Sequence, residues 1–194
     1  MKLSAVIELI DGFTGKPAVG APVRFELDGI PCQAQAKGQA FYAFPNLTDG
    51  QHRLAIFSMD HIFFDQNIAL DVPLATPLAE AIVACVLAPS PIYDFPAGTT
   101  LIRGKIIQGG KAGSALAGVD VGAAYQNVRA GALRARTVSC AYGRYNGRYA
   151  LALGGKLAAP TSVQLDFAKS GYADVQKKVA LAPGAVLFVD IEMH

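Results

Sequence analysis

Apolar and polar residues alternate along several short segments of the chain. In VRFEL (23–27), three apolar residues alternate with Arg24 and Glu26, and VQLDF (163–167) and LFVDIEM (187–193) show the same period of two. Successive side chains of a β-strand point to opposite faces, so this pattern predicts strands with one buried face. Gly, Pro, Asn and Asp are frequent between these segments, which is typical of an all-β sandwich or barrel.

One segment gives a mixed signal. TPLAEAIVACVL (76–87) has helix-forming residues in its first half, but its second half is apolar and rich in β-branched residues. This composition favours a buried strand over the second half.

Two parts of the chain resemble each other. IELIDGFTGKPAVGAPVRF in the first half and GKIIQGGKAGSALAGVDVGA in the second both read as a strand, a glycine-rich loop and a second strand after Gly20 or Gly118. Further on, residues 54–70 align with residues 165–181 at a constant offset of 111. An internal repeat of this size predicts two copies of one sandwich.

The repeat divides the chain into an acidic N-terminal sandwich (1–88), a proline-rich linker (89–98) and a basic C-terminal sandwich (99–194). Prolines stiffen the linker because they fix φ and favour extended backbone. Its apolar residues are predicted to dock against one or both sandwiches, or to bind a partner; they are Ile92, Tyr93 and Phe95.

Glycines and apolar residues of the second half follow a recognisable family pattern, at Gly104, Gly118, Val119, Val121, Gly147, Tyr149, Leu151, Gly171 and Tyr172. With this pattern the second half resembles the carboxypeptidase regulatory-like domain. Asn146 stands where that family usually has Asp and Ser170 where it usually has Pro; in the weaker first copy His61 and Ile62 replace the Gly-Tyr corner. The resemblance implies two tandem Greek-key, prealbumin-like (transthyretin-like) sandwiches of about seven strands each, a fold that is reused as an accessory module.

The junction is similar to a second group. Residues 89–104 (PSPIYDFPAGTTLIRG) resemble small proteins encoded beside contractile phage-tail-like particles, which assemble in the cytoplasm. No signal peptide is recognisable at the start, and the longest apolar run, 81–88, is too short to span a bilayer. We therefore expect a cytoplasmic protein without a membrane span.

Charge differs between the halves although the net charge is only +2. Residues 1–98 hold 5 Lys and Arg against 10 Asp and Glu (−5), and residues 99–194 hold 12 against 5 (+7). Head-to-tail stacking, docking of the halves or an anionic partner would all use this asymmetry.

Three widely spaced cysteines without a CxxC motif favour reduced thiols over disulfides.

Catalytic motifs are not recognisable. The histidines, His52, His61 and His194, form no HExxH pair, and no GxSxG nucleophile motif occurs. Some transthyretin-like sandwiches hydrolyse 5-hydroxyisourate and end in Tyr-Arg-Gly-Ser, whereas this chain ends in VDIEMH. The sequence therefore predicts no catalytic residue, no metal ligand, no cofactor and no enzymatic activity.

Arginine and tyrosine are concentrated around CAYGRYNGRYAL (140–151). The candidate partner-binding residues are Arg134, Arg136, Tyr142, Arg144 and Tyr145. Both residue types are enriched at the centres of protein interfaces, and tyrosines also stack on sugars and bases. A protein partner, a carbohydrate and a nucleic acid are all compatible, the nucleic acid least because few lysines surround the cluster. A solvated basic face beside a hairpin is the simpler interpretation.

The two Gly-Arg-Tyr triplets in this segment are predicted to differ. Tyr149 shares a face with Leu151 and is expected in the core after a turn at Asn146 and Gly147, whereas Tyr142, Arg144 and Tyr145 precede the turn. The sequence thus favours a structural or protein-interaction module, with a phage-tail-like accessory protein as its narrower form. A carbohydrate-binding module of the starch-binding-like type is the alternative.

Overall fold

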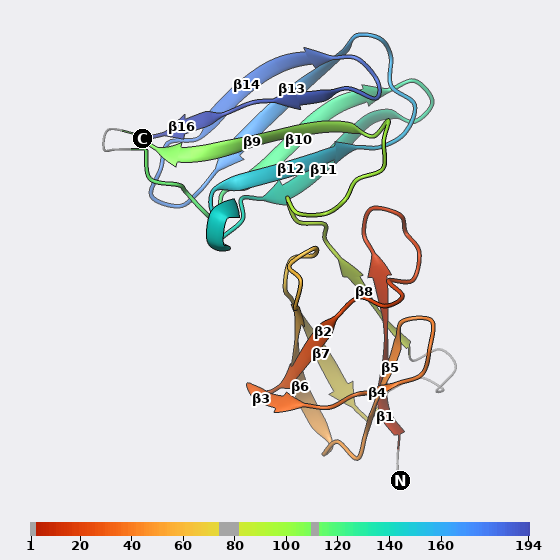
Figure 1. Cartoon of the computed structure of the whole chain (residues 1–194). Coiled ribbons are helices and arrows are strands. Elements are labelled where there is room, and N and C mark those ends of the chain that lie inside the picture. The colour runs from red at the N-terminus through yellow and green to blue at the C-terminus, as the bar shows by residue number, and fades with distance from the viewer. Residues whose placement is uncertain (1–2, 74–81, 110–112) are drawn as a thin grey trace. The chain divides into compact units, whose positions relative to one another are not determined.

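The structure is a computed structural model that describes residues 3–73, 82–109 and 113–194 (Figure 1). It divides into two compact units, Met1–Pro89 and Ser90–His194. Each unit is built from two β-sheets. The predicted fold class, an all-β protein with two tandem sandwiches, is confirmed.

Unit 1 contains eight strands in the described residues. One sheet has the order β4-β5-β1-β8 and the other the order β3-β2-β6-β7. The strands are β1 (Leu3–Asp11), β2 (Val23–Leu27), β3 (Ile30–Cys32), β4 (Gln35–Ala36), β5 (Phe41–Pro45), β6 (Gly50–Ser58), β7 (Gln66–Val72) and β8 (Ile82–Leu87).

Unit 2 repeats this arrangement. Its first sheet has the order β12-β9-β15, with β16 also pairing with β9, and its second sheet has the order β11-β10-β13-β14. The strands are β9 (Thr100–Gln108), β10 (Asp120–Asn127), β11 (Gly131–Val138), β12 (Arg148–Leu153), β13 (Thr161–Ala168), β14 (Val175–Leu181), β15 (Val186–Phe188) and β16 (Ile191–Met193). A 3-10 turn, Gly143–Tyr145, precedes β12.

The strand orders of the two units correspond, except that β4 has no counterpart in unit 2 and that β15 and β16 together take the place of β8. The first strand of each unit lies beside the last and runs parallel to it, β1 with β8 and β9 with β15 and β16. The second strand of each unit, β2 or β10, pairs with the strand that follows it, β3 or β11, and with β6 or β13. The internal repeat inferred from the sequence is therefore a repeat of topology.

Strand pairing refines the alignment of the two copies. In unit 1, Leu54 lies opposite Ile68. The sequence alignment matches Ile68 with Val179 of unit 2, and Val179 lies opposite Val163. Leu54 thus corresponds to Val163 and not to Leu165, a shift of two residues in β13. An even shift keeps the same side chains facing inward, so the apolar pattern alone could not reveal it.

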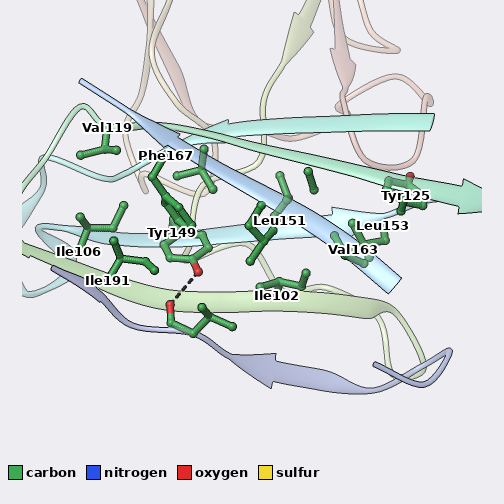
Figure 2. Close-up of a cluster of buried hydrophobic side chains, with 14 of the residues drawn as sticks. Ile102, Ile106, Val119, Tyr125, Tyr149, Leu151, Leu153, Val163, Phe167 and Ile191 are labelled. Atoms are coloured by element: carbon green, nitrogen blue, oxygen red, sulfur yellow. Dashed lines mark hydrogen bonds between the residues drawn. The ribbon is translucent and has the colours of Figure 1, made fainter. Parts of the chain in front are cut away.

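The alternating pattern predicted for residues 163–167 is confirmed in the core of unit 2. Val163, Leu165 and Phe167 are fully buried and project from β13 toward the other sheet. Figure 2 shows Phe167 beside Tyr149, with the ring centroids 5.6 Å apart in a T-shaped arrangement. Such edge-to-face pairs add to the stabilisation from burial.

The alternating pattern predicts one continuous strand over residues 187–193, but these residues form two strands. β15 ends at Phe188 and β16 begins at Ile191, although Val189, Ile191 and Met193 are buried on the predicted face. At the break the Tyr149 hydroxyl donates a 2.7 Å hydrogen bond to the Val189 carbonyl (dashed in Figure 2), and the Asp190 carboxylate accepts one from the Lys105 N–H. These two side chains take part in the hydrogen bonding at the break, beside the backbone bond from the Val189 N–H to the Arg103 carbonyl.

The second half of residues 76–87 is a strand, as predicted, from Ile82 to Leu87; residues 76–81 lie outside the described residues. β8 is at the edge of its sheet, and only one of its faces is buried. Cys85 and Leu87 face the core, whereas Ile82 and Val86 are 41% and 55% exposed. The prediction of a buried strand is therefore wrong for the outward face.

Candidate partner-binding surface

The segment between β11 and β12 crosses from one sheet of unit 2 to the other. β11 pairs with β10, and β12 pairs with β9, so these two strands do not form a hairpin, although the turn predicted at Asn146 and Gly147 is present. Gly147 has a φ of 74°, and its N–H donates to the Cys140 carbonyl at 2.8 Å. A Cβ at this position would lie 2.7 Å from the Ile106 carbonyl oxygen. The glycine is thus required by its backbone conformation and by close packing against β9.

The first Gly-Arg-Tyr triplet lies at the surface of this crossing segment. Tyr142 is 49% exposed, and the Arg144 guanidinium lies over the Tyr145 ring, 5.1 Å from its centroid. Arg144 also donates a hydrogen bond to the Tyr145 hydroxyl. The second triplet differs, because Tyr149 is 1% exposed, as the sequence predicted. Burial, together with the charge of Asp190, raises the pKa of the Tyr149 hydroxyl.

Tyr145 is brought together with basic residues of β9 and β12. These residues lie around one cavity of about 300 Å³. Its lining consists of Pro91, Arg103, Gly104, Lys105, Tyr145, Arg148, Tyr149, Phe188 and Asp190. Lys105 and Arg148 are opposite each other in the strand pair, and the Asp190 carboxylate in the same cavity supplies a counter-charge to these like charges. Sequence reasoning missed Arg103 and Lys105, although their spacing of two on a strand already indicated a shared outward face.

The proline-rich segment packs within unit 2. Ile92, Tyr93 and Phe95, the candidate docking residues, are half-buried, and the rings of Tyr93 and Phe95 are 4.8 Å apart. The Arg103 guanidinium lies 5.5 Å from the centroid of the Phe95 ring, within the range of cation–π attraction. The segment thus holds one cation of the cavity in place.

Arg134 and Arg136 lie on the other sheet. On β11 they are exposed and lie opposite Ala124 and Gly122 of β10, respectively. They line a separate hollow of about 320 Å³ that does not include Tyr145. The five candidate residues therefore occupy two surfaces of unit 2, one at the crossing segment and one on the outer face of the four-stranded sheet.

In unit 1 the main polar group is built around His52. Its Nδ1 lies 2.7 Å from the Asp28 carboxylate and its Nε2 lies 2.9 Å from the Thr48 carbonyl oxygen. Both ring nitrogens face acceptors, which favours the doubly protonated ring, so the pKa of His52 is raised. The pKa of Asp28 is lowered by hydrogen bonds from the Arg53 N–H and from His52. This arrangement links the turn of the β2–β3 hairpin to β6.

Two further observations concern only the residues that the structure describes. Within residues 3–73, 82–109 and 113–194, no three His, Cys, Asp or Glu side chains lie close enough together to hold a metal ion. No helix in these ranges is long and apolar enough to cross a membrane.

No protein-family model matches the chain, and no curated protein sequence matches it. The predicted resemblances to the carboxypeptidase regulatory-like domain and to proteins of phage-tail-like particles are therefore not confirmed. Among solved structures, the TIE protein of Bacillus anthracis is similar over 98% of this chain at 10% identity and a TM-score of 0.33; this chain spans 34% of that protein.

Two pilus proteins are similar at the same low level. The minor pilin GBS52 of Streptococcus agalactiae is 11% identical over 98% of this chain and 95% of its own, with a TM-score of 0.36. A C-terminal fragment of the pilus adhesin SpaC of Lactobacillus rhamnosus GG is 14% identical over 98% of each chain, with a TM-score of 0.35. Similarity this distant carries no information about what the chain does.

Proposed function

We propose that the chain is a non-enzymatic interaction module that binds protein partners, including other copies of itself, through charge. The observation that carries this proposal is the separation of charge along the chain, −5 over residues 1–98 and +7 over residues 99–194. Charge of opposite sign on two parts of one molecule steers association between molecules and orients them head to tail.

The cations of unit 2 are available for such contacts. Lys105, Arg134, Arg136 and Arg148 are exposed, and none of them forms an ion pair with an acid in the described residues. An unpaired surface cation gains more from a partner's carboxylate than a paired one, because no existing contact is lost.

An accessory component of a phage-tail-like particle is the narrower form of this proposal, and it rests on the junction sequence 89–104 alone.

The test is the ionic-strength dependence of association. In sedimentation velocity the protein should self-associate, or bind a copurifying partner, at about 50 mM NaCl and separate at about 500 mM, since added salt shortens the range of charge interactions. Charge reversal by Arg134→Glu with Arg136→Glu should weaken association more than the matched reversal of Arg129 and Lys156. A monomer that has no partner at either salt concentration would overturn the proposal.

A carbohydrate-binding module is the second candidate. It is supported by the half-exposed side chain of Tyr142, because tyrosine faces stack on sugar rings. Binding on a polysaccharide array that is lost in Tyr142→Ala or Tyr145→Ala would favour it over the protein-interaction function. Absence of binding to every polysaccharide would remove it.

A further inference from the structure

We infer that the outer face of the β11-β10-β13-β14 sheet is a groove that binds an extended acidic peptide segment of a protein partner. The inference deepens the proposed function and rests on it. The floor of the groove is Gly122 and Ala124, whose positions on β10 face outward between exposed Arg134 and Arg136 on β11 and Gln164 and Asp166 on β13.

The hollow extends along much of β10. Its first part, of about 320 Å³, lies around Gly122 between Arg136 and Asp166. A second part, of about 590 Å³, continues past Ala124 to Gln126. Both parts are lined by Ala124 and Arg134, so they adjoin at these two residues. A long shallow hollow along one strand fits an extended chain better than a compact ligand.

In unit 1, long side chains cover the corresponding outer face of the sheet. By strand pairing, Arg24 and Glu26 of β2 occupy the positions of Gly122 and Ala124. Arg24 forms an ion pair with Glu26, and its guanidinium lies 4.3 Å from the centroid of the Phe57 ring. Long side chains thus cover the central strand in unit 1, and small residues leave it bare in unit 2.

The fold does not require a glycine at position 122. Its φ is not in the left-handed region, and a Cβ added there would meet no atom closer than 3.8 Å, the distance to Asp166. Glycine in the interior of a strand costs stability, and it often marks a place where another chain approaches closely. Neither the backbone conformation nor close packing therefore accounts for glycine at this position.

The charges of the walls define the ligand. Arg134 and Arg136 form no ion pair in the described part of the chain, and neither does Asp166 across the floor. Residues two apart on a strand are about 7 Å apart, which is also the spacing of alternate residues in an extended peptide. A peptide with acidic residues at alternate positions would face the arginines, and its neutral side would face Gln164 and Asp166.

The experiment measures binding of a fluorescent hexapeptide of alternating Glu and Ser by anisotropy. The double variant Gly122→Arg with Ala124→Glu rebuilds the filled face of unit 1 at unchanged net charge. It should weaken binding about tenfold or more, because the added side chains occupy the groove. Arg134→Gln with Arg136→Gln should weaken it by roughly tenfold per arginine, whereas Arg129→Gln, outside the groove, should have little effect.

The controls separate this inference from the proposed function. Circular dichroism and urea unfolding would show that the filled variant is folded. If that variant binds the peptide as well as the natural protein does, or if Arg129→Gln weakens binding as much as a groove arginine, the groove inference is wrong. Equal binding of an oligogalacturonate hexamer would also overturn the peptide as ligand. Salt-dependent association that survives in the filled variant would support the proposed function while placing it on another surface.

Discussion

The two units share one strand order but cover the outer face of the second strand differently. β2 carries Arg24 and Glu26, which pair with each other over the sheet, whereas β10 carries Gly122 and Ala124 beneath unpaired arginines. The inward side chains of both strands are apolar and set the topology. The outward positions contribute little to the choice of fold, so they can differ between the two copies without a change in strand order.

The first and last strands differ as well. β8 pairs with β1 without interruption from Val6 to Asp11, but the last strand of unit 2 is broken between Phe188 and Ile191. In unit 1 Tyr42 lies opposite Ile7, and in unit 2 Tyr149 lies opposite Gly104. The missing side chain at Gly104 leaves the space through which the Tyr149 hydroxyl reaches Val189. The break is therefore linked to one glycine.

The largest effect is expected from Gly104→Ala. Its Cβ would lie 1.9 Å from the Val189 carbonyl oxygen and 2.9 Å from the Tyr149 ring. The backbone would have to move, so we expect unit 2 to lose more than about 3 kcal/mol of unfolding free energy. Native-state hydrogen exchange of the β9 and β12 amides measures this loss. Unit 1 should keep its protection from exchange. Unchanged protection in unit 2 would show that the backbone at Gly104 and Val189 can accommodate a Cβ.

A smaller effect is expected from Tyr149→Phe. The variant keeps the ring but leaves the buried Val189 carbonyl without its hydrogen bond, which should cost about 1–3 kcal/mol in the same exchange measurement. The matched control is Tyr42→Phe, because the Tyr42 hydroxyl has no hydrogen-bond partner among the residues the structure describes. Equal losses in the two variants would contradict the link between this hydroxyl and the broken strand.

The pH dependence of stability should differ between the units. His52 has a raised pKa, so its contribution is fully present below 6.5, the ordinary value, and is lost as the pH rises through the raised value. Asp28 has a lowered pKa, so its contribution is present above 3.8 and is lost as the pH falls through the lowered value. Unit 1 should therefore be most stable between pH 3.8 and pH 6.5, where both contributions are present.

Urea unfolding followed by exchange of the β2 and β6 amides, repeated from pH 3 to pH 9, tests this dependence. Asp28→Asn removes the carboxylate and suits the left-handed backbone of this residue, with a φ of 52°, so it should flatten the profile of unit 1. Asp71→Asn, on the outer face of β7, is the control and should leave the profile curved. A flat profile in the natural protein would contradict the role of the His52–Asp28 pair.

The sequence predicted the features that depend on local pattern. The inward face of residues 163–167 and the burial of Tyr149 follow from a period of two, which neighbouring residues determine. The break at Val189 could not be predicted, because it depends on a tyrosine from a distant strand. The separation of Arg134 from Tyr145 also depends on which sheet each strand joins, and local pattern does not specify this.

The smallest effect concerns the groove itself. Gly122→Ala should raise the unfolding free energy of unit 2 by about 0.5–1 kcal/mol, because alanine loses less backbone entropy in a strand and its Cβ has room. Exchange of the β10 and β13 amides measures the gain. A loss of stability would mean that the fold requires glycine at this position. The difference between Gly122 and Arg24, the residue at the same position of unit 1, would then be explained by packing within unit 2. A gain would mean that the natural chain keeps a less stable residue where a bound segment would lie against the strand.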